Sequence, residues 1–167
     1  AVVGGFGFWL LKIDSNGIEQ WRSVFGGYWA SSVVQTSDGG YALAGERSEY
    51  GPAHSWLVKT NESGALQWDR TYGGAGHDNA GYVLQTDDGG YVLAGSSSSF
   101  GSGGSDAWLV RTDAFGNKLW DKTFGGSGEE GFASIKPTED NGYILAGMTT
   151  SLGDGGYDVW LMKTDES

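Results

Sequence analysis

Apolar and polar residues alternate over short stretches along the whole chain, and glycine-containing turns separate these stretches. The stretches are rich in β-branched and aromatic residues, which is typical of short β-strands. Turns such as Asp87-Asp88-Gly89-Gly90 supply glycine where a hairpin needs positive φ. The pattern therefore predicts linked antiparallel hairpins, and in the clearest stretch we expect strands over residues 81–86, 91–96, 107–112 and 118–124.

This four-strand unit repeats along the sequence. A Trp-Leu-x-Lys/Arg motif recurs at intervals of 47, 52 and 52 residues, and a second Trp follows twelve residues after each of the first three copies. A Gly-Tyr-x-Leu-Ala-Gly motif has the same period, at residues 40–45, 90–95 and 142–147. Such periodicity indicates a repeat architecture. The motif tryptophans are Trp9, Trp56, Trp108 and Trp160, and the second ones are Trp21, Trp68 and Trp120.

The predicted strands carry apolar side chains on both faces, as Tyr91-Val92-Leu93-Ala94-Gly95 illustrates. A sheet that is apolar on both faces must be covered on both. Identical neighbouring sheets provide that cover in a β-propeller. We therefore expect an all-β single domain over residues 1–167, with about three and a half propeller-type, four-stranded antiparallel blades. The expected units are a partial blade over 1–27, blades over 28–74 and 75–126, and a partial blade over 127–167.

The combined pattern W-L-x-K-T-D, W-x-x-x-F-G-G and Q-T-x-D-G-G-Y-x-L-A-G resembles the tandem repeats of large secreted archaeal and bacterial surface proteins. It is more distantly similar to kelch-type blades. The resemblance covers essentially the whole chain. It implies extracellular propellers used in adhesion, surface layers or assembly, and it supplies no catalytic residues.

Both terminal blades are expected to be incomplete. Residues 1–5 align with the end of a second strand, so that the first blade lacks its first strand, and the last blade lacks its fourth. Fourteen strands result. An open array of this kind exposes apolar faces and unpaired edges. We therefore expect copies of the chain to associate with one another, in a ring or in a filament.

Charge and composition restrict the partners. The net charge of −11 opposes binding to nucleic acid and to anionic membrane surfaces, and no apolar run reaches the length of a membrane span. The absence of cysteine excludes disulfides and thiolate chemistry. An acidic, cysteine-free chain rich in Gly and Ser is the composition expected of an extracellular or cell-surface protein.

The sequence contains three kinds of motif that resemble catalytic or cofactor-binding sites, but each lacks a feature that its chemistry requires. Residues 126–131 match G-x-G-x-x-G, but two acidic residues lie inside the motif and a strand is expected next, so that no helix N-terminus is available for a phosphate. His54 and His77 lie in different loops and are expected to be solvated. Carboxylate pairs such as Glu129/Glu130 lie in turns, without the opposed geometry that a glycosidase needs. The expectation is no enzyme, no catalytic residue, no cofactor and no dedicated metal site.

Structural calcium remains an alternative, because residues 104–106 and 154–158 are rich in oxygen ligands, although no EF-hand pattern is present. The repeated cations Lys12, Lys59, Arg111 and Lys163 are expected to neutralise acids nearby. Asn61-Glu62-Ser63 is a glycosylation sequon in a turn.

Tyr28 and Trp29 stand where the next repeat has Asp78 and Asn79. An exposed aromatic pair can stack on a sugar ring. The alternative is that Trp29 packs on a neighbouring blade or subunit, since aromatic residues are enriched at interfaces. The sequence thus predicts a structural, self-assembling extracellular protein, with a glycan-binding or adhesive module as the alternative.

Overall fold

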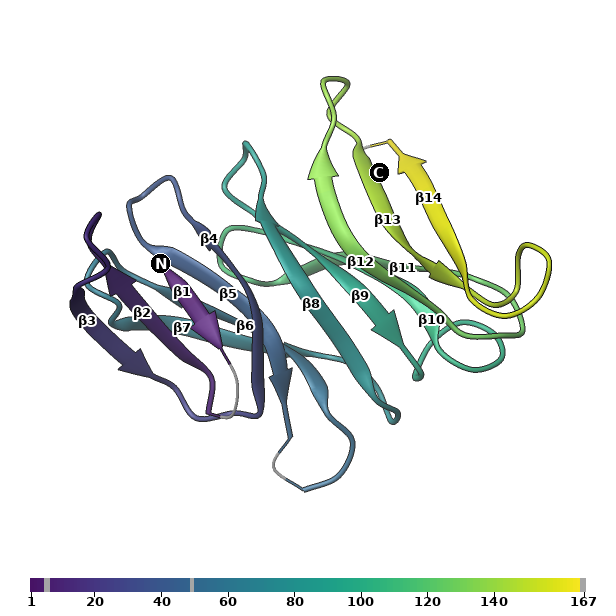
Figure 1. The fold of residues 1–167 in the computed structure, drawn as a ribbon, viewed down its shortest axis with the longest axis horizontal. Helices are drawn as coiled ribbons and strands as arrows, with labels where there is room; N and C mark the ends of the chain where they lie inside the picture. Colours follow the sequence, from purple (N-terminus) through teal and green to yellow (C-terminus); the bar gives the residue numbers. More distant parts are fainter. Residues whose placement is uncertain (5–6, 49, 166–167) are drawn as a thin grey trace.

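A computed structural model describes residues 1–4, 7–48 and 50–165 of the chain. The described residues form fourteen β-strands in four antiparallel sheets, and within each sheet the strands pair in chain order. Figure 1 shows the sheets following one another across the molecule, with the N-terminus beside the first and the C-terminus beside the last. The described part of the chain contains no helix of the length and apolarity that a membrane span requires.

The strand bounds agree closely with the repeat read from the sequence. The first sheet contains β1 (Val2–Gly4), β2 (Trp9–Ile13) and β3 (Glu19–Val24). The second contains β4 (Trp29–Gln35), β5 (Tyr41–Arg47), β6 (His54–Thr60) and β7 (Leu66–Tyr72). The third contains β8 (Asp78–Gln85), β9 (Tyr91–Ser97), β10 (Asp106–Thr112) and β11 (Lys118–Phe124). The fourth contains β12 (Glu130–Pro137), β13 (Tyr143–Thr149) and β14 (Asp158–Thr164).

The first strand of the third sheet is longer than predicted. We expected it over residues 81–86, whereas β8 begins at Asp78, and its counterpart β12 in the fourth sheet begins at Glu130. In both strands the pairing register shifts, between Asn79 and Tyr82 and between Phe132 and Ser134. Such a shift marks a β-bulge, which breaks the simple alternation of side chains. The alternation used for the prediction therefore starts only after the bulge.

Adjacent sheets pack face to face, and each junction holds one apolar cluster. We call the face of a sheet that points to the next sheet in the chain its forward face, and the opposite one its backward face. Leu57 on the forward face of the second sheet packs in one cluster with Leu93 and Trp108 on the backward face of the third. Leu109 on the forward face of the third packs in the same way with Leu145 of the fourth. Burying a leucine side chain stabilises the fold by about 1.5–3 kcal/mol.

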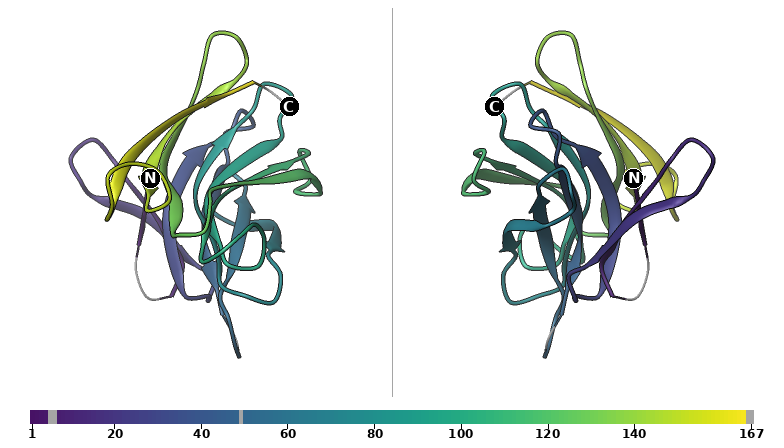
Figure 2. Two further views of the ribbon diagram at one scale, coloured as in Figure 1. Left: turned by 90° about the vertical axis from the view of Figure 1, so that its right-hand side faces the viewer. Right: turned by 90° about the vertical axis from the view of Figure 1, so that its left-hand side faces the viewer.

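The turns between the last two strands of each unit also join neighbouring sheets. Gly116, between β10 and β11, lies against the Trp68 ring of β7, and the Tyr72 hydroxyl of β7 donates a hydrogen bond of 2.8 Å to the Gly116 carbonyl. Gly64 lies against Trp21 of β3 in the same way. The second and third sheets therefore each contact the preceding sheet through a face and through a turn. The two side views in Figure 2 present the first and fourth sheets at the two ends of this series.

Candidate functional site

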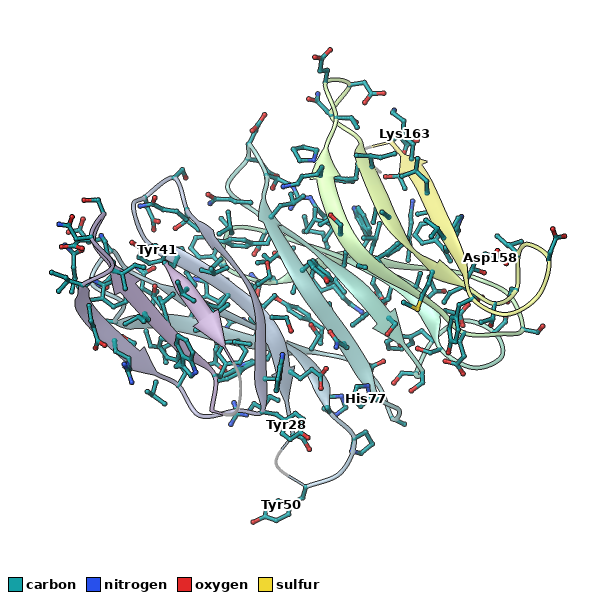
Figure 3. The ribbon with its side chains drawn as sticks, in the orientation of Figure 1. Tyr28, Tyr41, Tyr50, His77, Asp158 and Lys163 are labelled. Carbon is teal, nitrogen blue, oxygen red and sulfur yellow. The ribbon has the colours of Figure 1, made fainter. Side chains whose placement is uncertain are left out.

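The aromatic pair Tyr28 and Trp29 lies at the start of β4, where the side chains are 49% and 43% exposed. The Tyr28 backbone N–H donates to the Glu46 carbonyl of β5, which fixes the position of the pair. Figure 3 shows Tyr28 at the same end of the molecule as Tyr50, which is fully exposed, and His77. The expected exposure of both rings is thus present, whereas a ligand for them stays a prediction.

Asn61 opens the turn between β6 and β7, as expected of the sequon. Its side-chain oxygen accepts hydrogen bonds from the Ser63 and Ala65 backbone N–H groups, at 3.0 and 2.9 Å. Asp113 has the same role in the turn between β10 and β11. Asn61 therefore has a structural role as the cap of its turn, and its modification stays a prediction.

The two histidines differ in their surroundings: His77 is exposed in the loop before β8, as expected, whereas His54 lies half-buried at the start of β6. His54 Nδ1 lies 3.6 Å from Asp78 Oδ2, and His77 Nε2 lies 3.5 Å from Glu46 Oε2. Each pair joins the second sheet to the third. The sequence did not indicate these contacts, because the partners are 24 and 31 residues apart and no motif links them.

The residue types around Asp78 are those of a catalytic triad, but their order is different. Ser97 and Ser99 donate their hydroxyls to Asp78, which also lies beside His54. A triad needs the histidine between the serine and the acid, so that the imidazole can take the serine proton. Here the acid lies between the other two, and it is fully buried. The arrangement holds a loop in place, and its order is not the one by which a triad activates its serine.

Asp78 and Glu130 occupy equivalent positions at the start of β8 and β12, and each holds the loop that follows the second strand of its own sheet. Glu130 accepts hydrogen bonds from the Thr149 hydroxyl and from the Gly126 and Ser151 backbone N–H groups, at 2.9, 2.8 and 3.0 Å. Burial acts to raise the pKa of Glu130, but these hydrogen bonds outweigh it and lower the pKa to about 2. The Asp78 pKa is lowered by the same kind of bonds, against the effect of burial.

Three of the four repeated cations, all except Lys12, neutralise acids, as predicted. Lys59 Nζ lies 2.8 Å from Asp38 Oδ2, and Arg111 contacts Asp88 at 2.6 Å. Lys163 pairs with Asp140 in the same way. In each case the acid lies in the turn between the first two strands of the same sheet. The hydrogen bonds from Lys59 are the largest of the effects that lower the Asp38 pKa to about 2. These cations therefore hold turns.

The residues considered for metal and phosphate binding lie within the part of the chain that the structure describes. It contains no group of three or more His, Asp or Glu side chains placed to hold one metal ion. The residues considered for calcium lie in the loops before β10 and β14, where Asp106 Oδ2 accepts the Ser102 backbone N–H. The G-x-G-x-x-G stretch runs directly into β12, so that a strand follows it, as expected.

The forward face of the fourth sheet is the largest departure from the repeat. Val159 and Leu161 of β14 are 92% and 69% exposed, whereas the equivalent Ala107 and Leu109 of β10 are 0% and 1% exposed. Met148 of β13 adds to the same face and is also exposed. An exposed apolar surface on a sheet is a candidate interaction site. We call Met148, Val159 and Leu161 the forward end face.

The backward face of the first sheet is the matching surface at the other end of the series. Val2, Trp9 and Leu11 stand where the second sheet has Leu43, Trp56 and Val58, according to the strand registers. Leu43, Trp56 and Val58 are buried against the first sheet, whereas Val2 is 42% exposed and Trp9 and Leu11 are half-buried. We call Val2, Trp9 and Leu11 the backward end face.

No protein-family model matches this chain, and no curated protein matches it. The function therefore has to be inferred from the geometry of the two end faces and of the loops.

Proposed function

We propose that this protein is a structural, self-assembling scaffold of the extracellular surface, built from propeller-type blades that associate end to end. The four sheets would be successive blades, the first and last with three strands each. The assembled form would be a surface layer, a ring or a filament. Glycans remain possible additional partners.

The observation that carries the proposal is the exposure of the forward end face. In all three preceding sheets the residue equivalent to Leu161, which is Leu10, Leu57 or Leu109, is buried by the backward face of the next sheet. The chain therefore contains three examples of the kind of surface that covers this face. A second copy offers such a surface in its backward end face.

The contact between these two faces is head-to-tail, because the two faces belong to different ends of the molecule. A head-to-tail contact closes into a ring when the rotation between copies is suitable, and it continues as a filament otherwise. The acidic chain would add repulsion between copies, which salt screens. Electron microscopy of the assembled protein distinguishes the two forms.

Sedimentation velocity tests the proposal. The wild-type chain is expected to form species larger than the 17.7 kDa monomer, and Leu161→Asp is expected to be monomeric because it places a charge in the contact. Leu119→Asp is the matched control, since Leu119 of β11 is 58% exposed and so is its counterpart Leu66, at 53%. A wild-type chain that stays monomeric at all concentrations tested would contradict the proposal.

The extracellular location rests on composition, namely the acidic charge and the absence of cysteine. Fractionation of cells that express the natural gene tests it: we expect the protein in the culture medium or on the cell surface.

Glycan binding is the second candidate, and the exposure of Tyr28 and Trp29 favours it. An exposed aromatic ring can stack on the apolar face of a sugar. We expect binding on a glycan array to be lost in Trp29→Ala and kept in Tyr157→Ala, which removes an exposed aromatic ring in the loop before β14. Equal binding by both variants would contradict this candidate.

A further inference from the structure

The edge strand β14 differs from its counterparts in the second and third sheets. There, β6 pairs with β5 and β7, and β10 pairs with β9 and β11. By contrast, β14 pairs with β13 alone among the described strands. An edge strand presents a row of backbone N–H and C=O groups to any extended chain that comes beside it.

A specific hydrogen bond is also missing beside β14. Trp56 Nε1 donates to Asp69 Oδ2 of β7 at 2.8 Å, and Trp108 Nε1 donates to Asp121 Oδ2 of β11 at 3.1 Å. Trp160 of β14 occupies the equivalent position, and within the described ranges its indole N–H has no acceptor. The structure thus shows which group the indole takes when a neighbouring strand is present.

A groove of about 440 Å³ lies next to β14. Its walls include Leu109, Trp120 and Phe124 of the third sheet and Met162 and Thr164 of β14. The strand β10 of the third sheet is the counterpart of β14. At β10, the place that corresponds to the groove is occupied by β11. The groove therefore has one wall formed by the third sheet, with Leu109, Trp120 and Phe124 beside Lys122, and a hydrogen-bonding wall formed by the edge of β14.

We propose that this groove is a strand-addition site that binds an extended segment with the pattern Trp-Asp-x-Thr-aromatic. Both four-stranded sheets use this pattern in their last strand, as Trp68-Asp69-Arg70-Thr71-Tyr72 and as Trp120-Asp121-Lys122-Thr123-Phe124. The backbone of the segment would pair with β14, and its aspartate would accept the Trp160 indole N–H. The occupant is an extended polypeptide segment that carries this pattern and is not among the paired strands of residues 1–167.

The pattern also explains why β3 of a second copy is not the segment that binds beside β14. In β3 the residue equivalent to Asp69 is Arg22, as the registers of the two strand pairs show. A guanidinium has no acceptor for the indole N–H. A strand from the first sheet of a second copy would leave Trp160 without its hydrogen bond, so that the site and the end-to-end contact are distinct.

Peptide binding tests the proposal on the full chain. The probe is a capped, fluorescently labelled peptide with the sequence of residues 118–124, titrated by anisotropy. We expect saturable binding and about tenfold weaker binding of the Asp121→Ala peptide, because a hydrogen bond to a charged acceptor is lost. On Trp160→Phe protein the two peptides should bind within about twofold of each other, since the donor is absent.

Two controls make the test specific. Trp21→Phe protein, altered at a tryptophan of β3 that contacts Tyr41 of the second sheet and lies outside both end faces, should distinguish the two peptides as the wild type does. Hydrogen exchange of the wild-type chain should show new protection over β14 when the peptide is bound. No saturable binding, an aspartate effect that persists in Trp160→Phe, or binding without protection of β14 would each overturn the proposal.

Discussion

Glu130 shows how a single buried charge orders two loops. Its carboxylate accepts hydrogen bonds from both the loop before β12 and the loop after β13. A buried carboxylate is tolerated because these donors replace the water that it loses. The acid is therefore a structural residue, although an acidic side chain beside a glycine-rich loop has the appearance of a ligand site.

Replacing this carboxylate by an amide should destabilise the fold. In Glu130→Gln one acceptor oxygen becomes an NH₂ group, which faces a backbone N–H and cannot accept from it. We expect the free energy of unfolding to fall by about 1–3 kcal/mol, measured by urea denaturation at pH 7. The adjacent Glu129 is exposed, so that Glu129→Gln should change the stability by less than about 0.5 kcal/mol. Equal effects of the two variants would contradict the structural role.

The same residue makes the stability depend on pH. The folded state lowers the pKa of Glu130 from 4.5 to about 2, so that the unfolded state binds the proton more readily. The stabilisation is complete above pH 4.5 and is lost as the pH falls toward 2. Urea denaturation between pH 5 and 2.5 should show a steeper loss of stability for the wild type than for Glu130→Gln. Parallel curves would contradict this prediction.

At the scale of the elements, the turns between the third and fourth strands connect one sheet to the next. Gly116 and Gly17 are equivalent, and both have positive φ, at 76° and 81°. A Cβ on Gly116 would lie 2.7 Å from the Trp68 ring, whereas a Cβ on Gly17 would meet nothing within 4 Å. Both positions thus favour glycine because of their positive φ, but only Gly116 is also restricted by a close contact with a neighbouring sheet.

This pair gives a matched test of the turn contact. Gly17→Ala should cost about 1 kcal/mol of stability, because alanine is strained at positive φ. Gly116→Ala introduces the same backbone strain and also displaces the turn from Trp68. This displacement should increase the loss of stability by a further amount of about 1–3 kcal/mol. Thermal denaturation of both variants measures the difference. Equal losses would show that the turn of the third sheet does not depend on its contact with β7.

The repeat made most of these elements predictable from the sequence. The glycine turns and the tryptophan spacing placed all fourteen strands, because each strand has an aromatic or β-branched run between turn residues. The bulge in the first strand of each unit was missed, since alternation is interrupted there. The pairing of His54 with Asp78 and of Trp56 with Asp69 was also missed, because it depends on three-dimensional proximity.

At the scale of the molecule, the series of sheets has two chemically different ends. The forward end face has Val159 and Leu161 on β14, and the backward end face has Val2 and Leu11 on β1 and β2. In the interior each forward face is covered by a backward face, with Leu109 buried in the same cluster as Leu145 and Trp160. The interior junctions therefore predict a polar assembly, in which every copy has the same direction.

Mixing two variants tests this direction. Leu161→Asp disables the forward end face, and Leu11→Asp disables the backward one, because each places a charge in an apolar contact. Each variant alone should be monomeric, since every head-to-tail contact needs both faces. An equimolar mixture should give a one-to-one heterodimer, in which the intact forward face of one variant binds the intact backward face of the other. The heterodimer has no further intact end, so that growth stops there. Light scattering measures the mass of each sample. If Leu11→Asp alone associates as the wild type does, two forward faces bind each other and the assembly is symmetric.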